Sequence, residues 1–169
     1  MIRYLVYLIE IILCYLLQTS VFANFRVFGV VPDCFLILII VLSLTKGQNQ
    51  AIAAGFFSGL LLDLMFSETI GTCSIIYMFI AYIAGRFNRM FDPHSLIVPA
   101  IAIFTGELFY SLAYYIFGFF LLGKTSLGSY MLNMILPRAF YTLVVAVLLY
   151  PLFLFVQKKL MDLEGFSNE

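Results

Sequence analysis

Five ionisable residues lie within or at the edges of long apolar runs, and they are the side chains best placed to do chemistry: Glu10, Asp33, Asp63, Glu107 and Arg138. A charge at the centre of an inserted helix costs about 2.5–3.5 kcal/mol, so such residues usually have a role. Glu107 and Arg138 are the obvious candidates for an ion pair, although about 10 Å of helical rise separates their expected depths. If they pair, neutralising one partner should destabilise the protein more than neutralising both. A proton or ion relay is the alternative, but relays usually need more carboxylates in line.

Asp33 and Asp63 are both expected near the outer ends of their helices, where two interpretations stay open. They could share a polar site for a partner or a cation. Alternatively, Asp33 caps a helix that opens with Pro32, and Asp63 makes a hydrogen bond between helices. Glu10, in the first apolar run, could reach the inner interface or pair with a neighbouring helix.

The stretch Gly55-Phe-Phe-Ser-Gly59-Leu-Leu-Leu-Asp63 combines small residues with one of these carboxylates. The two glycines and the aspartate recur at every fourth position and therefore fall on one helical face. Glycines on such a face let a second helix approach closely. We expect this glycine face (Gly55, Gly59 and Asp63) to hold the protein's own bundle together or to receive a partner's helix. Gly59→Leu should disrupt that contact. Gly71 lies in the break between the third and fourth predicted spans, and we include it among the residues expected in helix packing or partner binding.

Signatures of catalysis and metal binding are absent from the sequence. There is no glycine-rich phosphate loop, HExxH motif or G-x-S-x-G elbow, and Asp33 and Asp63 lack the motif residues of an intramembrane protease. The three cysteines, Cys14, Cys34 and Cys73, have no metal-ligand spacing, although a disulfide between Cys34 and Cys73 is an alternative. We therefore expect no enzyme, no cofactor and no metal. The formal net charge of zero gives no electrostatic basis for binding nucleic acid.

The elements that position these residues are the apolar runs themselves. The chain has 169 residues, of which 64% are hydrophobic and 11% are charged, and its mean hydropathy is +1.09. This composition indicates an all-α polytopic membrane protein, and the short polar gaps leave no room for a second domain. Residues 1–169 are expected to form one integral membrane domain. The first run is expected to be a retained helix rather than a signal peptide, because Glu10 interrupts it.

Apolar runs and helix breakers predict a compact bundle of six transmembrane helices, at approximately 3–23, 31–46, 48–66, 71–90, 95–121 and 130–157. A tight polar turn at residues 46–50 separates the second span from the third, and Asp92-Pro93 ends the fourth. A count of five spans, with residues 31–66 as one bent unit, is the alternative.

Basic residues indicate the orientation of the bundle. With an inner N-terminus, the outer side holds Arg26 and Lys124, whereas the inner side holds Arg3, Lys46, Arg86, Arg89, Lys158 and Lys159. By the positive-inside rule this excess places both termini in the cytoplasm, and a five-span count would spoil the alternation. The inner basic residues could contact cytoplasmic partners or anionic lipid.

An ordered set of motifs within residues 15–90 resembles a known family. Gln18-Thr19-Ser20 ends the first span and Pro32-Asp33 opens the second. The later motifs are Ala54-Gly55-Phe56-Phe57-Ser58-Gly59-Leu60-Leu61-Leu62-Asp63-Leu64, then Glu68-Thr69-Ile70-Gly71, then Tyr77 and Ala81-Tyr82-Ile83-Ala84-Gly85-Arg86. In this order and spacing the chain is similar to the bacterial rod-shape-determining MreD family.

The resemblance implies a plasma-membrane component of the bacterial cell-elongation machinery. Members of this family bind the bitopic protein MreC. With the MreB filament, the RodA glycosyltransferase and its transpeptidase partner, they support lateral peptidoglycan synthesis and rod shape. The family is thought to share the six-helix fold of the substrate-binding S components of energy-coupling-factor vitamin transporters. The resemblance therefore implies a non-catalytic scaffold on a transporter-like fold.

Two other functions stay open on the sequence. A vitamin-binding transporter subunit would need a cavity at the outer face with several converging donors, closed by loops near residues 24–31 and 123–129. A flippase-like lipid carrier would need a lateral opening that contains Arg138 or Glu107. The shape and lining of an outer cavity discriminate these functions from a scaffold.

Overall fold

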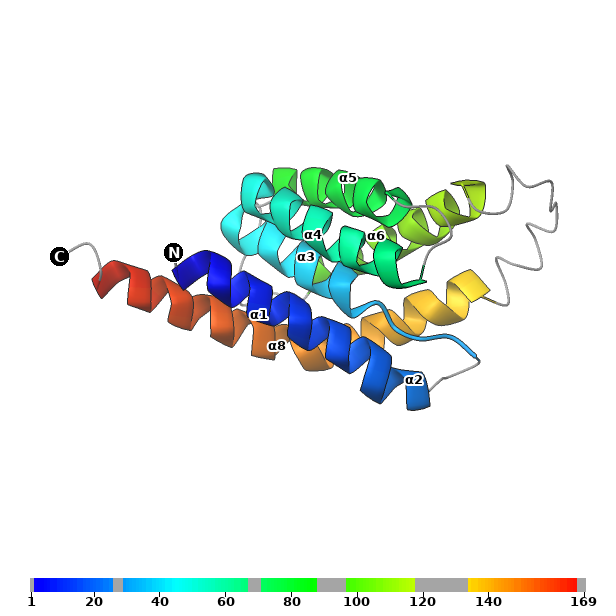
Figure 1. The fold of residues 1–169 in the computed structure, drawn as a ribbon, viewed down its shortest axis with the longest axis horizontal. Helices are drawn as coiled ribbons and strands as arrows, with labels where there is room; N and C mark the ends of the chain where they lie inside the picture. Colours follow the sequence, from blue (N-terminus) through cyan, green and yellow to red (C-terminus); the bar gives the residue numbers. More distant parts are fainter. Residues whose placement is uncertain (1, 26–28, 67–70, 88–96, 118–133, 167–169) are drawn as a thin grey trace.

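The computed structural model describes residues 2–25, 29–66, 71–87, 97–117 and 134–166, and its regular elements are helices. The first helical segment runs continuously through α1 (Ile2–Leu16), a π-helical turn (Leu17–Val21) and α2 (Phe22–Asn24). The others are α3 (Cys34–Lys46), α4 (Gln48–Phe66), α5 (Thr72–Arg86), α6 (Ile97–Tyr115) and α8 (Leu136–Phe166). Figure 1 shows these helices running along one long direction, with both chain ends at the same end of the molecule.

The helix boundaries agree with the sequence pattern where breakers are strong. The third predicted span, 48–66, coincides with α4, and Gly47 separates it from α3 with a left-handed φ of 87°. Because α3 and α4 are two helices rather than one bent unit, the described part of the chain contains six helical segments and not five. Pro32 is not in the first turn as expected, because α3 begins only at Cys34, after Asp33. The last helix continues to Phe166, beyond the predicted end at residue 157. The ends expected at 121 and 130 lie outside the described residues.

Helix α3 forms the centre of the molecule. Every residue from Cys34 to Leu44 is buried, and α3 contacts α1, α4, α5, α6 and α8. A helix that is apolar on all sides must be surrounded by other apolar elements, and α3 fulfils that rule. Its 13 residues span only about 20 Å at 1.5 Å per residue. The neighbouring helices cover this length.

The outer helices present apolar side chains to their surroundings. Leu148 on α8 is 71% exposed and Ile97 on α6 is 69% exposed, and similar large residues are exposed on α1 and α5. Within the described residues, Ile97–Tyr115 and Leu136–Lys159 are long and apolar enough to cross a membrane. An apolar exterior around a buried apolar helix suits lipid surroundings.

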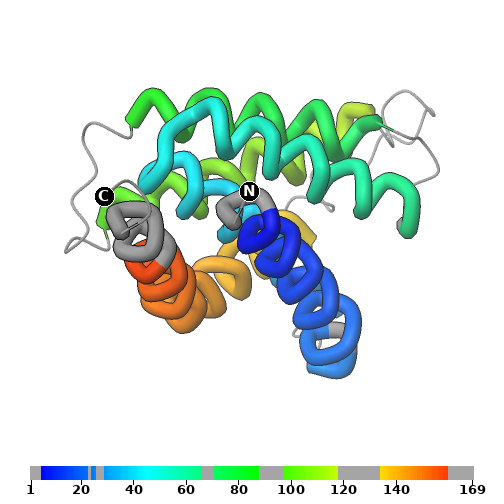
Figure 2. The backbone as a smooth tube through the Cα atoms, turned by 60° about the vertical axis from the view of Figure 1, so that its left-hand side comes forward, coloured from blue at the N-terminus to red at the C-terminus, as the bar shows by residue number. Residues whose placement is uncertain are grey.

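Helices α4 and α5 pack side by side along their lengths, whereas α1 and α8 lie on another side of α3. Figure 2 separates α1 from α8, which overlap in Figure 1, and shows both below α4 and α5 in that view. This arrangement brings residues from distant parts of the sequence to the same depth in the bundle.

Candidate functional site

Asp33 caps the central helix and is fully buried. Its Oδ1 accepts a hydrogen bond from the Leu36 backbone N–H at 3.0 Å, which satisfies one of the free donors at the start of α3. The Asp33 backbone N–H donates to Thr142 Oγ1 of α8 at 3.1 Å. The sequence interpretation of Asp33 as a helix cap is therefore confirmed.

Arg138 joins two buried carboxylates. Its Nη2 donates to Asp33 Oδ2 at 3.1 Å, and its Nε lies 2.8 Å from Glu107 Oε1. The predicted pairing of Glu107 with Arg138 is confirmed, and Asp33 is a third member that the sequence did not indicate. The contact with Glu107 is an ion pair without hydrogen-bond alignment, since neither Glu107 oxygen has a hydrogen-bond partner among the described residues. These contacts connect α3, α6 and α8 in one charge cluster (Asp33, Glu107 and Arg138).

Two stacked tyrosines lie beside the charge cluster. The Tyr77 hydroxyl of α5 donates to Asp33 Oδ2 at 2.6 Å. The Tyr77 and Tyr110 rings stack with their centroids 5.0 Å apart, and the Arg138 guanidinium carbon lies 5.0 Å from the centroid of the Tyr110 ring. A cation over an aromatic face is stabilised by the ring quadrupole. The charge cluster is thereby linked to a fourth helix.

Asp63 caps the helix that follows it in the chain. One carboxylate oxygen accepts from the Cys73 N–H at 3.0 Å. The other accepts from the Gly71 N–H at 3.0 Å and from the Ser74 N–H and hydroxyl, each at 3.1 Å. These donors are at the start of α5, where a negative charge is favoured by the helix dipole. Gly71, just before α5, has a left-handed φ of 102°.

The glycine face is covered by the protein's own helix α5. A Cβ at Gly59 would lie 2.4 Å from Ser74 Cα, and one at Gly55 would lie 3.1 Å from the Tyr77 carbonyl oxygen. Both distances are too short for an added methyl group unless the backbone of α5 moves. Of the two alternatives, packing within the bundle is therefore the one that the structure shows. Gly85 makes a similar contact with Gln48 at the other end of the same pair of helices, where the Cβ atoms would be 2.5 Å apart.

A second buried polar contact connects α1 to α8. Glu10 and Gln157 are both buried, and Gln157 Nε2 donates to the two oxygens of Glu10 at 3.0 and 3.1 Å. Glu10 therefore pairs with a neighbouring helix rather than reaching the surface. Sequence reasoning missed Gln157, Tyr77 and Gly85 as partners, since an uncharged residue in an apolar run gives no indication of what it contacts.

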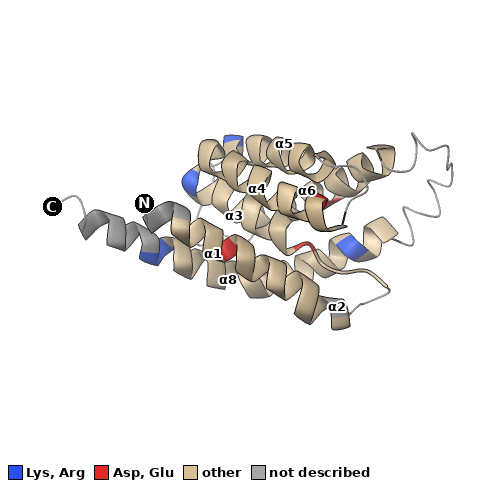
Figure 3. Ribbon diagram, in the orientation of Figure 1, with Lys and Arg blue, Asp and Glu red and all other residues tan. Residues whose placement is uncertain are grey.

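The remaining predicted basic residues gather at one end of the bundle. Arg86 ends α5, and Lys158 and Lys159 lie in the last part of α8; all three are exposed. Figure 3 shows the blue segments at the end where both termini lie, except for one on α8 in the other half of the molecule. Arg89 lies outside the described residues, as do Glu68 to Ile70 and Arg26.

Asp33 and Asp63 do not form the shared polar site that was one of the two interpretations. Asp33 is bonded to α5 and α8 through Tyr77 and Arg138, whereas Asp63 is bonded to the first turn of α5. In the described residues no group of three His, Cys, Asp or Glu side chains is arranged to hold a metal. All three cysteines are buried and free, so a Cys34–Cys73 disulfide is not formed.

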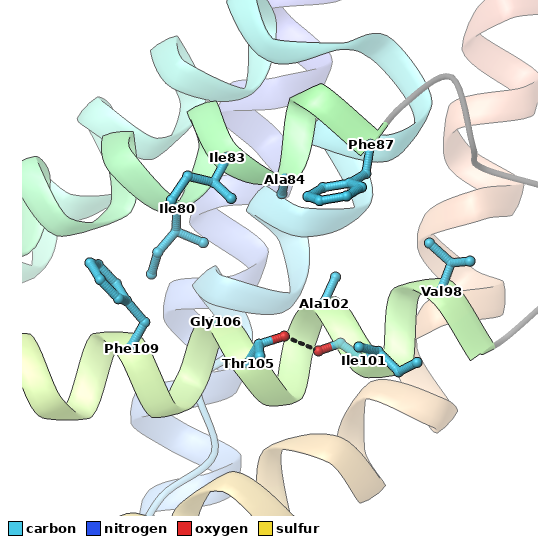
Figure 4. A pocket seen from close by; sticks show the side chains of 10 residues that line it. All are labelled: Ile80, Ile83, Ala84, Phe87, Val98, Ile101, Ala102, Thr105, Gly106 and Phe109. Carbon is cyan, nitrogen blue, oxygen red and sulfur yellow. Dashed lines mark hydrogen bonds between the residues drawn. The ribbon is translucent and has the colours of Figure 1, made fainter.

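Two cavities in the described part of the chain have linings of different polarity. An apolar groove of about 500 Å³ lies between α5 and α6, and its side chains include Ile80, Phe87 and Phe109. Figure 4 shows that the Thr105 hydroxyl within it donates to the Ile101 carbonyl. A second cavity of about 270 Å³ lies beside the charge cluster and is lined partly by Gln18, Ser111 and Arg138.

These features define a helical membrane protein whose buried charges join its own helices. The family model for the rod shape-determining protein MreD matches residues 1–159 of the chain. The chain belongs to this family, whose members are membrane proteins with a role in determining rod shape. No curated protein and no solved structure matches the chain.

Proposed function

We propose that this protein is a non-catalytic scaffold of the cell-elongation machinery, which binds MreC and supports lateral peptidoglycan synthesis. The main support for this proposal is that all five intramembrane ionisable residues contact other groups within the bundle. Asp33, Glu107 and Arg138 contact one another, Asp63 caps α5, and Glu10 is bonded to Gln157. Groups that are engaged in this way connect helices within the bundle, which is a structural role.

In this proposal the chain is a single domain in the bacterial plasma membrane with both termini in the cytoplasm. The exposed basic residues Arg86, Lys158 and Lys159 lie on elements that end on the side of the termini. They would face anionic lipid headgroups or cytoplasmic partners. The partners expected besides MreC are MreB, RodA and the transpeptidase that works with RodA.

A substrate-binding subunit of a vitamin transporter is the alternative function. The observation in its favour is the cavity of about 270 Å³ with Gln18, Ser111 and Arg138 in its lining. Small-molecule sites usually have volumes of about 300–1,000 Å³, so this cavity is small for a whole vitamin. The scaffold is therefore the better-supported function.

Affinity purification from detergent-solubilised membranes, followed by quantitative mass spectrometry, tests the proposal. A scaffold should recover MreC at a near-equal molar amount, together with wall synthases. Recovery of ATP-binding-cassette subunits in place of these proteins would overturn it. A polytopic membrane protein with the same tag and abundance is the control for non-specific recovery.

A further inference from the structure

The cavity beside the charge cluster is lined by two kinds of side chain. Its polar part consists of Gln18 from the first helical segment, Ser111 from α6 and Arg138 from α8. The other lining residues are apolar: Val30, Val31, Met134 and Ile135. A ligand that fills this space must therefore combine a polar group with hydrocarbon.

The free hydrogen-bonding capacity of the polar part consists mainly of donors. Gln18 Oε1 already accepts from the Cys34 N–H at 3.2 Å, which leaves its amide NH₂ as a donor. Arg138 directs Nε and Nη2 to Glu107 and Asp33, which leaves Nη1, and its side chain is 26% exposed. The three side chains that line the cavity can thus bind an acceptor oxygen.

Of the three side chains, Ser111 gives the strongest indication that the cavity binds a ligand. It is 5% exposed, and its hydroxyl lies near Glu107 but has no hydrogen bond of normal geometry among the described residues. A buried hydroxyl without a well-aligned partner costs up to about 1–3 kcal/mol. An occupant of the cavity that bonds to Ser111 would remove this cost.

The charged residues beside the cavity favour a ligand whose acceptor group is uncharged. Two carboxylates, Asp33 and Glu107, contact the single guanidinium of Arg138, so the charge cluster formally carries one excess negative charge. An anionic group such as a phosphate would be repelled by this excess. A carbonyl oxygen is a neutral acceptor and meets no such repulsion.

The cavity lies toward one end of the bundle. Ser111 lies four residues before the end of α6, Arg138 is the third residue of α8, and Val31 precedes α3. Helical turns continue after α6 to Phe117 and begin before α8 at Met134, so Ser111 and Arg138 are within about 9 Å of the ends of the described helices at 1.5 Å per residue. A membrane lipid beside this end of the bundle would bring the boundary of its hydrocarbon core toward this level. Ester carbonyls join the acyl chains to the glycerol of a phospholipid at this level.

We propose that this cavity binds the glycerol-ester region of a membrane lipid, with its ester carbonyls accepting hydrogen bonds from Ser111, Arg138 and Gln18. The acyl chains would follow Val30, Val31, Met134 and Ile135. This proposal concerns lipid recognition and does not depend on which proteins the scaffold binds.

Native mass spectrometry of the delipidated, detergent-purified protein tests the proposal. The probes are dioleoylphosphatidylglycerol and its dioleyl ether analogue, which has the same headgroup but lacks the two carbonyls. The ester lipid should bind about 2- to 10-fold more tightly, as expected for lost hydrogen bonds. Dioleoylglycerol, which has the esters but no phosphate, should show the same preference over its ether analogue.

Two variants of Ser111 and one control variant locate the site. Ser111→Ala removes the hydroxyl and should reduce the ester preference, and Ser111→Leu should fill the cavity and abolish it. Ala102→Leu, in the apolar groove between α5 and α6, should keep the preference of the unchanged protein. Equal binding of ester and ether lipids, or an ester preference unchanged in both Ser111 variants, would overturn the proposal. Binding that requires the phosphate but not the esters would overturn it as well.

Discussion

Arg138 and Asp33 are 105 positions apart in the sequence, yet Arg138 Nη2 lies 3.1 Å from Asp33 Oδ2. The same guanidinium also lies 2.8 Å from Glu107. One positive group therefore balances two buried carboxylates, and the three residues are not equivalent. The effect of a substitution in the charge cluster therefore depends on which of the three residues is changed.

Arg138→Gln should be the most destabilising single neutralisation in the charge cluster, because it leaves Asp33 and Glu107 buried without a counter-charge. Breaking a buried ion pair costs about 3–5 kcal/mol. Glu107→Gln should cost less, because Asp33 still pairs with Arg138. The Arg138→Gln/Glu107→Gln double variant should be more stable than Arg138→Gln alone. Unfolding of purified protein in mixed micelles measures these free energies, and strictly additive losses would contradict the coupling.

Gly59→Ala should destabilise the bundle, because the new Cβ would lie 2.4 Å from the backbone of Ser74. Overpacking costs about 1–3 kcal/mol, which outweighs the higher helix propensity of alanine. Gly106→Ala is the matched control, since its Cβ would meet only side-chain ends, with the Ile40 Cδ1 at 3.0 Å as the nearest. The apparent melting temperature by size-exclusion chromatography after heating should fall more for Gly59→Ala. Equal shifts for the two variants would argue against close α4–α5 packing.

Asp63→Ala should cost at least the upper end of the roughly 0.5–2 kcal/mol range for a lost helix cap. The reason is that it leaves the N–H groups of Gly71, Cys73 and Ser74 without their acceptor. Asp63→Asn keeps one side-chain oxygen and should be less harmful. Ser74→Ala removes a single hydroxyl bond and serves as the mild control. Hydrogen exchange at the start of α5 should rise in the order Ser74→Ala, Asp63→Asn, Asp63→Ala, and no change in Asp63→Ala would exclude capping.

Both termini should lie in the cytoplasm. A green fluorescent protein fused after Lys159 should fluoresce, and alkaline phosphatase at the same position should be inactive. The same two reporters fused after Lys124, which is expected on the outer side, should give the opposite pattern. Phosphatase activity at the Lys159 fusion would reverse the proposed orientation.

The sequence was sufficient to predict the helices and the types of residue at the site, but not most of the contacts. Strong breakers such as Gly47 gave the boundary between α3 and α4, because a left-handed turn is local. Charge in an apolar run identified Glu107 and Arg138 as partners, because few other groups can balance a buried charge. Tyr77 and Gln157 were missed, since their roles depend on which helix faces which. The long side chain of Arg138 reaches both carboxylates, despite the expected separation of about 10 Å in helical rise.

The most direct test of a scaffold against a relay or transport function is the shape of cells in which Glu107→Gln replaces the native protein. Glu107→Gln removes a titratable group while Arg138 keeps Asp33 as its partner. If Glu107 serves only folding, cells with equal amounts of folded protein should keep the width, the length and the MreC recovery of unchanged cells. Round cells at a normal level of folded, membrane-inserted protein would show that the Glu107 carboxyl acts in function, and would contradict the scaffold account.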